Sequence, residues 1–466
     1  MSGLVGEVAA FAVAVREKGL DPALQQDAAR RVLDVIGNCL AARGEEVARI
    51  VTATVDQWGG HEIAGAIGGA SRYPAPSAAL VNGTLAHALD FDDTHLPSVL
   101  HPSSSVVPAA LAVAEQTGAD GAALLAAVAV GDEICVRLGM AGYDPELGNS
   151  IFFERGQHAT AICGAVAAAA SAGMLAGLDA DGIASAMGVA ASMGAGLLEA
   201  NRTGGTIKRA HCGWAAHAAV AATDLARHGL TGPPTVLEGR FGFFQAWCGD
   251  QARPEVVVRD LGTSWELPGI FFKPYPCNHF THAGIDAALQ LREDGVDPAD
   301  IAEIELGVPT PVLRTIAQPP EVKAAPPTGY AGAFSGPYTV AAALMGGGGL
   351  GVWMDDFTDE AVADPRRLEL AAKVRCVADA RCDEIFPHQF PAVLRVRTVS
   401  GTVLEKRVDA NRGGPLRPLT NEELGLKFAL GAGRVLPAER VGRLQEAVLS
   451  LASAPSVRDV VDLTRS

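Results

Sequence analysis

Apolar residues recur at helical spacing through the first half of the chain, and they predict a run of helices. The first of these has an apolar residue at every fourth position, at Leu24, Ala28, Val32, Ile36 and Leu40. Asp21 as N-cap and Pro22 at the first helical position predict where this helix starts. Further helices are predicted at residues 76–90, 104–117, 120–139, 158–177, 181–197 and 210–229. Several are apolar on almost all sides, which predicts burial inside a large helical bundle.

The pattern changes near Leu267, where proline and aromatic residues become frequent and strand-like alternation follows. Alternating apolar and polar residues predict strands at Ile301–Val308, Lys373–Val377 and Ala392–Val399. A two-residue turn at Ser400 and Gly401 then leads into a further strand, Thr402–Val408. These strands, together with one helix at 282–292, predict a small α+β domain.

Helical patterns return at the C-terminal end of the chain. Thr420 and Glu423 form a capping box that opens a helix, and Ala438–Leu451 is amphipathic. A chain of 466 residues is too long for one ordinary core. The prediction is a mainly α protein, in which a large all-helical domain is built from both chain ends and a smaller α+β domain is inserted into it. The predicted domain ranges are residues 1–267, 268–410 and 411–466.

Composition and charge argue against several classes of protein. The chain has 37 basic and 53 acidic residues and a net charge of −16, which disfavours a large binding surface for nucleic acid or for an anionic membrane. Neither a Rossmann nor a P-loop glycine motif occurs in a strand-turn-helix context, so nucleotide binding is not expected. Eight cysteines without a CxxC pair are typical of reduced thiols, which predicts a cytoplasmic protein.

One charge-free run raises the question of a membrane helix. Ala159–Leu178 has twenty residues without a charge, which is long enough to cross a bilayer. Ala, Gly and Ser dominate the run, however, and they gain little free energy on transfer into lipid compared with Leu or Ile. We therefore expect an interior helix and no membrane span. The N-terminus lacks a basic start and a cleavage site, so no signal peptide is expected.

The stretch from His87 to Ser105 concentrates side chains that donate, accept or shuttle protons. Carboxylates and an imidazole within it could hold a divalent metal, namely Asp90, Asp92, Asp93 and His95. The alternative is that one aspartate caps a helix while the others face water. The glycine and glutamate of an EF-hand and the HExxH of a zincin are both absent. The metal hypothesis therefore has no recognised motif behind it.

Two histidines are predicted to lie at the starts of helices. His101 precedes Pro102 and a run of serines, and His158 begins the charge-free helix. Helix starts bind anions through the helix dipole and the unpaired amides of the first turn. A histidine at such a position also serves as a simple capping group. The sequence leaves both roles open.

Lys208 opens an alanine-rich helix within the motif GGTIKRAHCGWAAHAA. A buried ammonium there would have a lowered pKa and could act as a base or as an anion clamp. The alternative is a surface lysine, but the helix dipole disfavours positive charge at a helix start. Arg155 and Arg209 could add guanidinium groups that bind a carboxylate.

Four further candidates lie in the predicted α+β domain. Lys273, His279 and His282 stand at its start, in KPYPCNHFTH. Tyr338, in FSGPYTVAAAL, could donate a proton from a half-buried phenol. Each of the four, taken alone, is also explained by a structural role.

Taken together, several of these segments resemble the MmgE/PrpD family. They are HALDFDDTH followed by HPSS, ERGQHATAICGA, GTIKRAHCGWAAHAAVAATDLARHGLTGPPTVLEGRFGF, KPYPCNHFTHAGIDAAL and FSGPYTVAAALM. They occur in family order and span most of the chain. The resemblance implies a helical domain built from both chain ends with an inserted α+β lid domain, a homodimer, and no metal or organic cofactor.

The resemblance also implies a site that binds small di- or tricarboxylates. Its pocket residues would be Asp90, Thr94, His101, His158, Lys208 and Tyr338, joined by either His279 or His282 from the lid. Such reactions place negative charge on a carbon beside a carboxylate, which Lys208, Arg209 and His101 could stabilise. PCNHFTH departs from related patterns, and so the choice between the two lid histidines stays open.

The leading functional prediction is cofactor-independent epimerisation of an amino-dicarboxylate such as iminodisuccinate, because the whole chain looks most like that branch. A proton would leave one face of the carbon and return on the other, with Lys208 or Tyr338 on one side and His158 or a lid histidine on the opposite side. One alternative is a lyase: a 2-methylcitrate or citrate dehydratase, or a cis-aconitate decarboxylase. The other is a carboxylate-binding protein without catalytic activity.

Overall fold

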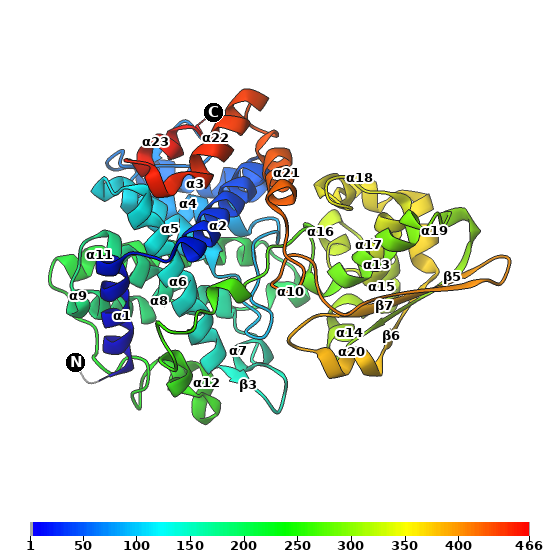
Figure 1. Cartoon of the computed structure of the whole chain (residues 1–466), viewed down its shortest axis with the longest axis horizontal. Coiled ribbons are helices and arrows are strands. Elements are labelled where there is room, and N and C mark those ends of the chain that lie inside the picture. The colour runs from blue at the N-terminus through cyan, green and yellow to red at the C-terminus, as the bar shows by residue number, and fades with distance from the viewer. Residues whose placement is uncertain (1–2, 466) are drawn as a thin grey trace. The chain divides into compact units, whose positions relative to one another are not determined.

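The computed structural model describes residues 3–465, apart from the side chain at position 202. The described chain is mainly α-helical, which confirms the predicted fold class. It folds into two compact units: unit 1 comprises residues 3–270 and 428–465, and unit 2 comprises residues 271–427 (Figure 1). The ranges predicted from the sequence change at 267 and 410, whereas the units divide at 270 and 427.

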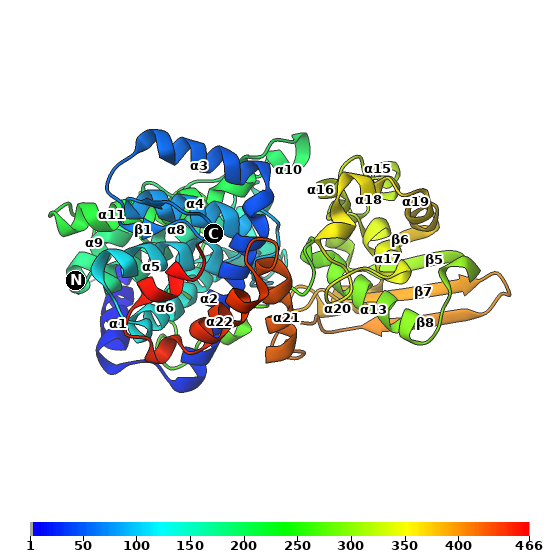
Figure 2. The same ribbon diagram turned by 90° about the horizontal axis from the view of Figure 1, so that it is seen from above.

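Unit 1 is a bundle of helices of very different burial. Its longer helices are α1 (Leu4–Lys18), α2 (Pro22–Ala41), α3 (Glu46–Trp58), α4 (Ala75–His87), α5 (Ser103–Thr117), α6 (Gly121–Ala141), α8 (Ala159–Leu175), α9 (Ala180–Ala191), α11 (His211–Arg227) and α22 (Ala438–Leu449). Its shorter helices are α7 (Ile151–Glu154), α10 (Ala200–Thr203), α12 (Phe243–Cys248) and α23 (Val457–Asp462). Every residue of α8 is buried, and this helix packs against α5, α6, α9 and α11. Figure 2 shows the C-terminal helix α22 beside the N-terminal helix α2, and α23 packs against α5, as expected of a unit built from both chain ends.

Local sequence signals set most helix ends correctly. Asp21 caps α2, accepting from the main-chain N–H of Ala23 at 2.9 Å, as predicted. The predicted end of α9 at residue 197 is wrong, because the helix stops at Ala191. Gly194 and Gly196 follow, and a Cβ at either position would lie about 3 Å from atoms at the start of α8. The chain leaves the helix there to pass close to its neighbour.

Unit 1 is not all-helical, which corrects the prediction. Two short antiparallel hairpins interrupt the helices, and they are formed by β1 (Ala64–Gly65) with β2 (Arg72–Tyr73) and by β3 (Tyr143–Asp144) with β4 (Asn149–Ser150). Each strand has only two residues, too few for alternation to be visible in the sequence.

The crossing of α4 and α11 depends on two glycines in contact. A Cβ on Gly83 would lie 2.8 Å from the Cα of Gly213, and a Cβ on Gly213 would lie 2.2 Å from Oγ1 of Thr84 and 2.3 Å from the main-chain oxygen of Leu80. Only residues without a side chain allow two helix backbones to approach this closely. The contact brings the start of α11 against the end of α4.

Gly213→Ala should therefore destabilise the protein, by about 1–3 kcal/mol, because the new methyl group overlaps main-chain atoms that cannot rotate away. Urea unfolding measures the change. The control is Gly442→Ala at an exposed position of α22, where an added Cβ meets nothing within 4 Å. That change should stabilise the protein by about 0.5–1 kcal/mol. Equal stability of the two variants would contradict the close crossing.

Unit 2 is built on a four-stranded sheet with the order β6-β5-β7-β8. Its strands are β5 (Ile301–Val308), β6 (Val374–Ala378), β7 (Ala392–Thr398) and β8 (Val403–Val408). β5 runs parallel to β6 and antiparallel to β7, so that Ile304 lies opposite Val374 on one side and Val396 on the other. The helices α13 (His282–Glu293) and α17 (Gly336–Met345) pack on the sheet, and α21 (Asn421–Ala432) leads back to unit 1. Short helices complete the unit, namely α14 (Leu313–Ile316), α15 (Pro320–Ala324), α16 (Gly329–Gly332), α18 (Asp359–Val362), α19 (Pro365–Ala372) and α20 (Ala380–Ile385).

The predicted strands and the predicted capping box of this region are confirmed, but the hairpin turn is longer than predicted. Thr398 donates its main-chain N–H to the oxygen of Thr402 at 2.9 Å, which leaves three residues in the loop. Gly401 adopts φ 88°, the left-handed conformation that closes a three-residue hairpin loop. The predicted two-residue turn is therefore wrong, because the loop has three residues and Gly401 occupies the third position.

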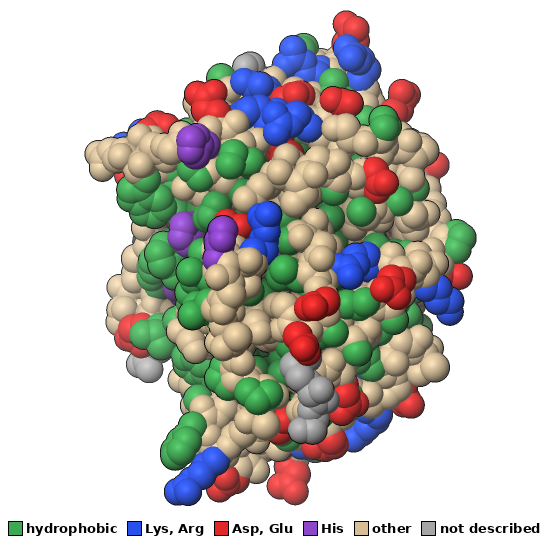
Figure 3. All heavy atoms as spheres, turned by 90° about the vertical axis from the view of Figure 1, so that its left-hand side faces the viewer, with side chains coloured by type: hydrophobic (Ala, Val, Ile, Leu, Met, Phe, Trp, Pro, Cys, Tyr) green, Lys and Arg blue, Asp and Glu red, His purple; other side chains and the backbone are tan. Residues whose placement is uncertain are grey.

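The structure bears on two of the predictions made from composition and charge. Within the described residues, no helix is both long enough and apolar enough to cross a bilayer. Figure 3 shows acidic side chains interspersed with basic ones on one face of the chain, in keeping with the net charge of −16.

Candidate active site

The loop between α4 and α5 carries the polar segment singled out in the sequence, and the structure buries it. His87 ends α4, and the loop passes through Asp92 and Asp93 before α5 begins at Ser103. The exposed fractions of His87, Asp92 and Asp93 are 2%, 0% and 1%. Asp90 adopts φ 53°, an uncommon value for a residue with a side chain, and such strain is frequent at functional sites. The alternative that these aspartates face water is therefore wrong.

Asp93 anchors the loop to the helices around it. Its Oδ2 accepts a hydrogen bond from Oγ of Ser103 at 2.5 Å and lies 3.4 Å from Nη1 of Arg31. Oγ of Ser103 is also 2.8 Å from Oδ2 of Asp132. Burial raises the pKa of Asp93 to about 6 and the pKa of Asp132 well above its usual range. Because the single hydroxyl hydrogen of Ser103 serves Asp93, we infer that Asp132 is protonated and donates to Ser103.

Asp132→Asn should make stability depend less on pH between about pH 4 and pH 7. A carboxyl with a raised pKa in the folded state releases its proton on unfolding in this window, so stability falls as pH rises, by on the order of 1 kcal/mol per pH unit for each proton. Asparagine donates the same hydrogen bond to Ser103 without titrating. Urea unfolding of both proteins across this range tests the expectation. Identical slopes against pH would show that Asp132 is ionised in the folded protein.

His101 is oriented by contacts on both sides. Its Nδ1 donates to the main-chain oxygen of Asp93 at 2.6 Å and lies 3.2 Å from Oγ1 of Thr94. Its main-chain N–H donates to Oγ1 of Thr160, in the first turn of α8, at 3.1 Å. Because Nδ1 carries a hydrogen in this arrangement, Nε2 is the ring atom that gains or loses a proton. The structure thus brings two predicted site residues, Thr94 and His101, into contact.

His158 pairs with a histidine that the sequence analysis gave no role. The Nδ1 atoms of His158 and His211 are 3.0 Å apart, so one ring donates and the other accepts. Burial and, to a smaller extent, the nearby cations together lower the pKa of His158 well below its usual value and that of His211 to about 4. Both rings are therefore neutral at pH 7.

Lys208 is buried at the start of α11, in the short 3-10 helix Ile207–Ala210. Its side chain is 10% exposed, and its Nζ lies 3.6 Å from Oδ1 of Asp90. The surface-lysine alternative is therefore wrong, and an aspartate of this chain balances the charge. Asp90 and Lys208, both predicted as site residues, form an ion pair that joins the loop to α11.

The two candidate arginines have other partners. Arg155 donates to the main-chain oxygen of Trp247 at 2.7 Å and to Oε1 of Gln251 at 3.3 Å. Arg209 forms an ion pair with Glu45 at 3.3 Å. A role for either in binding substrate would require these contacts to be exchanged.

The remaining candidates lie in unit 2. The rings of His279 and His282 have centroids 4.4 Å apart, and Nε2 of His282 lies 3.1 Å from the main-chain oxygen of Cys277. Lys273 is buried in the same stretch. Tyr338 is fully buried in the apolar core of this unit, and burial raises the pKa of its phenol.

The hydroxyl of Tyr338 already makes hydrogen bonds within unit 2. It donates to the main-chain oxygen of Asp356 at 2.5 Å and accepts from Nη1 of Arg367 at 2.9 Å. Proton donation by Tyr338 to a substrate would require the first of these bonds to break.

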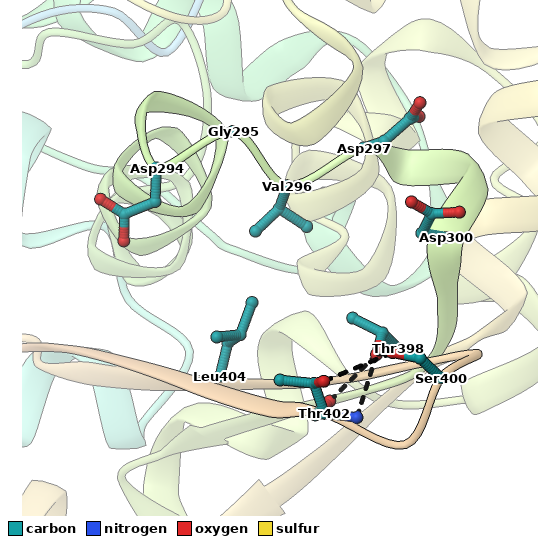
Figure 4. Close-up of a pocket in the computed structure, with 9 residues that line it drawn as sticks. All are labelled: Asp294, Gly295, Val296, Asp297, Asp300, Thr398, Ser400, Thr402 and Leu404. Atoms are coloured by element: carbon teal, nitrogen blue, oxygen red, sulfur yellow. Dashed lines mark hydrogen bonds between the residues drawn. The ribbon is translucent and has the colours of Figure 1, made fainter.

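Unit 2 has a surface hollow in which two of the lining aspartates make structural contacts. Figure 4 shows it at the end of the β7-β8 hairpin, with Asp294, Asp297 and Asp300 around it. Asp294 forms an ion pair with Lys406 at 2.7 Å, and Asp297 caps the turn that follows by accepting from Ala299 N–H at 2.9 Å. No predicted site residue lines this hollow.

The four residues suggested as metal ligands do not converge. Asp90 faces Lys208 and Asp93 faces Arg31, while His95 bonds to Ser98. Among the described residues, a different group, His87, Asp92 and Cys212, has possible donor atoms within 4.8 Å of one another.

The geometry of that group fits a shared proton better than a metal ion. Nδ1 of His87 is 2.7 Å from Oδ2 of Asp92, which is hydrogen-bond distance. Two ligands of a tetrahedral zinc ion, each about 2 Å from it, would be roughly 3.3 Å apart. We therefore assign this contact as a hydrogen bond.

The contacts described above join polar side chains of unit 1 into what we call the cluster, namely His87, Asp90, Asp92, Thr94, His101, His158, Lys208, His211 and Cys212. Sequence reasoning gave no role to two of its members, His87 and His211. His211 follows Lys208 by three positions at a helix start, a spacing that places two side chains on one face, and this signal could have identified it. His87 lies within the segment singled out for its polar groups, but nothing local shows that it packs against His158.

The chain is a mainly α-helical protein with an inserted α+β unit and a cluster of polar side chains in unit 1, and comparison with known families identifies the family. The MmgE/PrpD N-terminal domain matches residues 6–255, and the MmgE/PrpD C-terminal domain matches residues 275–453. The chain belongs to the MmgE/PrpD family. The cluster from His87 to Cys212 lies entirely within the N-terminal match.

Several curated relatives cover most of the chain. A cis-aconitate decarboxylase-like protein, oryM, of Aspergillus oryzae (strain ATCC 42149 / RIB 40) is 30% identical over 85% of this chain and 84% of its own length. The cis-aconitate decarboxylase of Aspergillus terreus (strain NIH 2624 / FGSC A1156) is 28% identical over 83% of this chain and 80% of its own. The human cis-aconitate decarboxylase is 29% identical over 91% and 87%.

Proposed function

We propose that this protein is a lyase that decarboxylates a small unsaturated tricarboxylate, with cis-aconitate as the first substrate to test. The observation that carries the proposal is the similarity, over more than four fifths of the chain, to proteins named cis-aconitate decarboxylase. These names support the lyase alternative. Epimerisation of iminodisuccinate, the leading prediction from the sequence, finds no support among them.

The buried cluster of unit 1 suits this chemistry. In a decarboxylation the bond between a carboxylate carbon and its neighbour breaks, CO2 leaves, and the electron pair stays on the substrate until a carbon is protonated. A buried cation stabilises that charge more strongly than a solvated one does. In our proposal Lys208, held by Asp90, stabilises the charge and binds a carboxylate. Thr94, which contacts His101, is a further proposed binding residue.

The reaction also needs one proton donor. His158 is neutral at pH 7, so it is not an acid in its resting state. His101 is only half-buried, so solvent screens a positive charge on its ring better than on the buried ring of His158. Its Nδ1 is bound to the main-chain oxygen of Asp93 and its Nε2 is left for proton transfer, and we assign it as the donor. Tyr338 and either His279 or His282 remain proposed contributors from unit 2, as does Lys273. A homodimer stays a prediction.

Incubation of the protein in D2O with 13C-labelled cis-aconitate, followed by NMR, tests the proposal. We expect labelled CO2 or bicarbonate and an alkene dicarboxylate that carries one deuterium from solvent. Iminodisuccinate isomers and methylcitrate are tested in parallel. Deuterium exchange with inversion of iminodisuccinate and no CO2 would instead establish the epimerase. Binding of a tricarboxylate without any turnover would establish the non-catalytic alternative.

A further inference from the structure

His87 lies at the centre of the cluster, between His101, His158 and Asp92. It is the last residue of α4, is 2% exposed, and has its Nδ1 2.7 Å from Oδ2 of the fully buried Asp92. Its ring centroid is 5.3 Å from that of His101 and 5.3 Å from that of His158. His87 therefore packs against both histidines that we assign to the site.

We propose that His87 and Asp92 form a buried ion pair that positions the site, in which the imidazolium of His87 keeps positive charge off His158. His87 is then a positioning residue that acts through its neighbours. The consequence for turnover rests on the proposed function, but the charge states can be measured without any substrate.

The surroundings of Asp92 require a cation. A carboxylate that is fully buried is strongly destabilised unless a positive group compensates it. The imidazole of His87 is at charge-assisted hydrogen-bond distance from it. Burial alone would lower the pKa of His87, but Asp92 and Cys212 raise it to about 10. His87 is accordingly protonated at pH 7.

A charged His87 keeps His158 neutral. Two imidazolium rings with centroids 5.3 Å apart would repel each other strongly in a buried site. The contact with His211 also limits this pair of rings to one positive charge, because two Nδ1 atoms 3.0 Å apart can share only a single hydrogen. If both rings were protonated, two N–H groups would face each other and this bond would be lost.

The titratable groups around His87 come from several elements. Asp92 and His101 lie on the α4-α5 loop, and His158 lies at the start of α8. Cys212, in α11, acts on His87 directly, while Lys208 and His211 act on His158. Asp92 is the acidic partner at 2.7 Å, and every histidine or lysine that acts on His158 disfavours a second charge there. The protonation state of His158 therefore depends on the His87–Asp92 pair.

NMR titration of protein labelled at histidine Cε1 tests this proposal between pH 4 and pH 10. In the wild type, the His87 signal, assigned by its loss in His87→Asn, should remain that of an imidazolium beyond pH 8, and the His158 signal should remain neutral down to pH 5. In His87→Asn, which keeps a donor for Asp92, the titration midpoint of His158 should rise by at least about one pH unit, a tenfold change in proton affinity. His228→Asn, which removes an exposed histidine, should leave His158 unchanged.

Asp92→Asn provides the second variant. It should bring deprotonation of His87 below pH 8 and raise the midpoint of His158 as His87→Asn does. A wild-type His87 that deprotonates near pH 6.5, or a His158 midpoint that is unchanged in both folded variants, would overturn the proposal. If neither variant folds, the wild-type spectrum still tests the proposal, because the absence of any histidine signal that remains that of an imidazolium beyond pH 8 would overturn it. Absence of decarboxylation would contradict only the proposed function. Where turnover is present, His87→Asn should also shift the acid limb of its pH profile upward.

Discussion

Lys208→Ala should abolish turnover of cis-aconitate, with a loss in kcat/KM of about a thousandfold or more, while the protein remains folded. The substitution removes the buried ammonium that balances Asp90 and, in our proposal, stabilises the charge left by departing CO2. Decarboxylation is followed by NMR, and the fold by circular dichroism and thermal unfolding.

Lys18→Ala is the matched control for this experiment. Lys18 is exposed in the last turn of α1, and its loss should leave both activity and fold unchanged. Activity near the wild-type level in Lys208→Ala would show that the assigned role is wrong. Loss of activity in both variants would point to an effect of total charge.

Arg31→Ala should lower the free energy of unfolding by about 3–5 kcal/mol. The side chain of Arg31 is 1% exposed and lies 3.2 Å from Asp27 and 3.4 Å from Asp93. It also donates to the main-chain oxygen of Ile270 at 2.8 Å. Its removal leaves buried carboxylate and carbonyl groups uncompensated.

Arg49→Ala serves as the comparison. Arg49 and Glu46 form an ion pair at 3.6 Å with both side chains exposed, and such pairs contribute about 0–1 kcal/mol. Urea unfolding measures both variants. A loss below about 1 kcal/mol in Arg31→Ala would mean that water reaches Asp93 when the arginine is absent, and that the loop is less tightly buried than the contacts indicate.

The parts of the fold that the sequence predicts well are those that depend on neighbours along the chain. The cap at Asp21, the capping box of Thr420 and Glu423, and the strand Ile301–Val308 all follow from local signals. Where the prediction failed, a contact from elsewhere intervened. Packing of a glycine segment against α8 ended α9 early, and a left-handed Gly401 lengthened the hairpin loop.

The candidate site divides in the same way. Asp90, Thr94, His101, His158 and Lys208 could be singled out because their motifs are unusual in an alanine-rich chain. The residues with which they pair could not be predicted from the sequence. Whether the aspartates of the loop face water or a buried cation was left open, because the answer depends on Arg31 and Lys208, which lie far away in the sequence.

The sequence by itself determined the mainly α class, the family resemblance and the candidate site residues, because periodicity, caps and motifs are local properties. Only the tertiary structure decided that His87 packs against His101 and His158, and that His158 shares a hydrogen with His211. The physical reason is helix packing between distant parts of the chain, which includes the close crossing of α4 and α11 at Gly83 and Gly213 and the packing of α8 on α11. It joins segments more than a hundred residues apart and removes their polar groups from water, and that burial sets which of them carry charge.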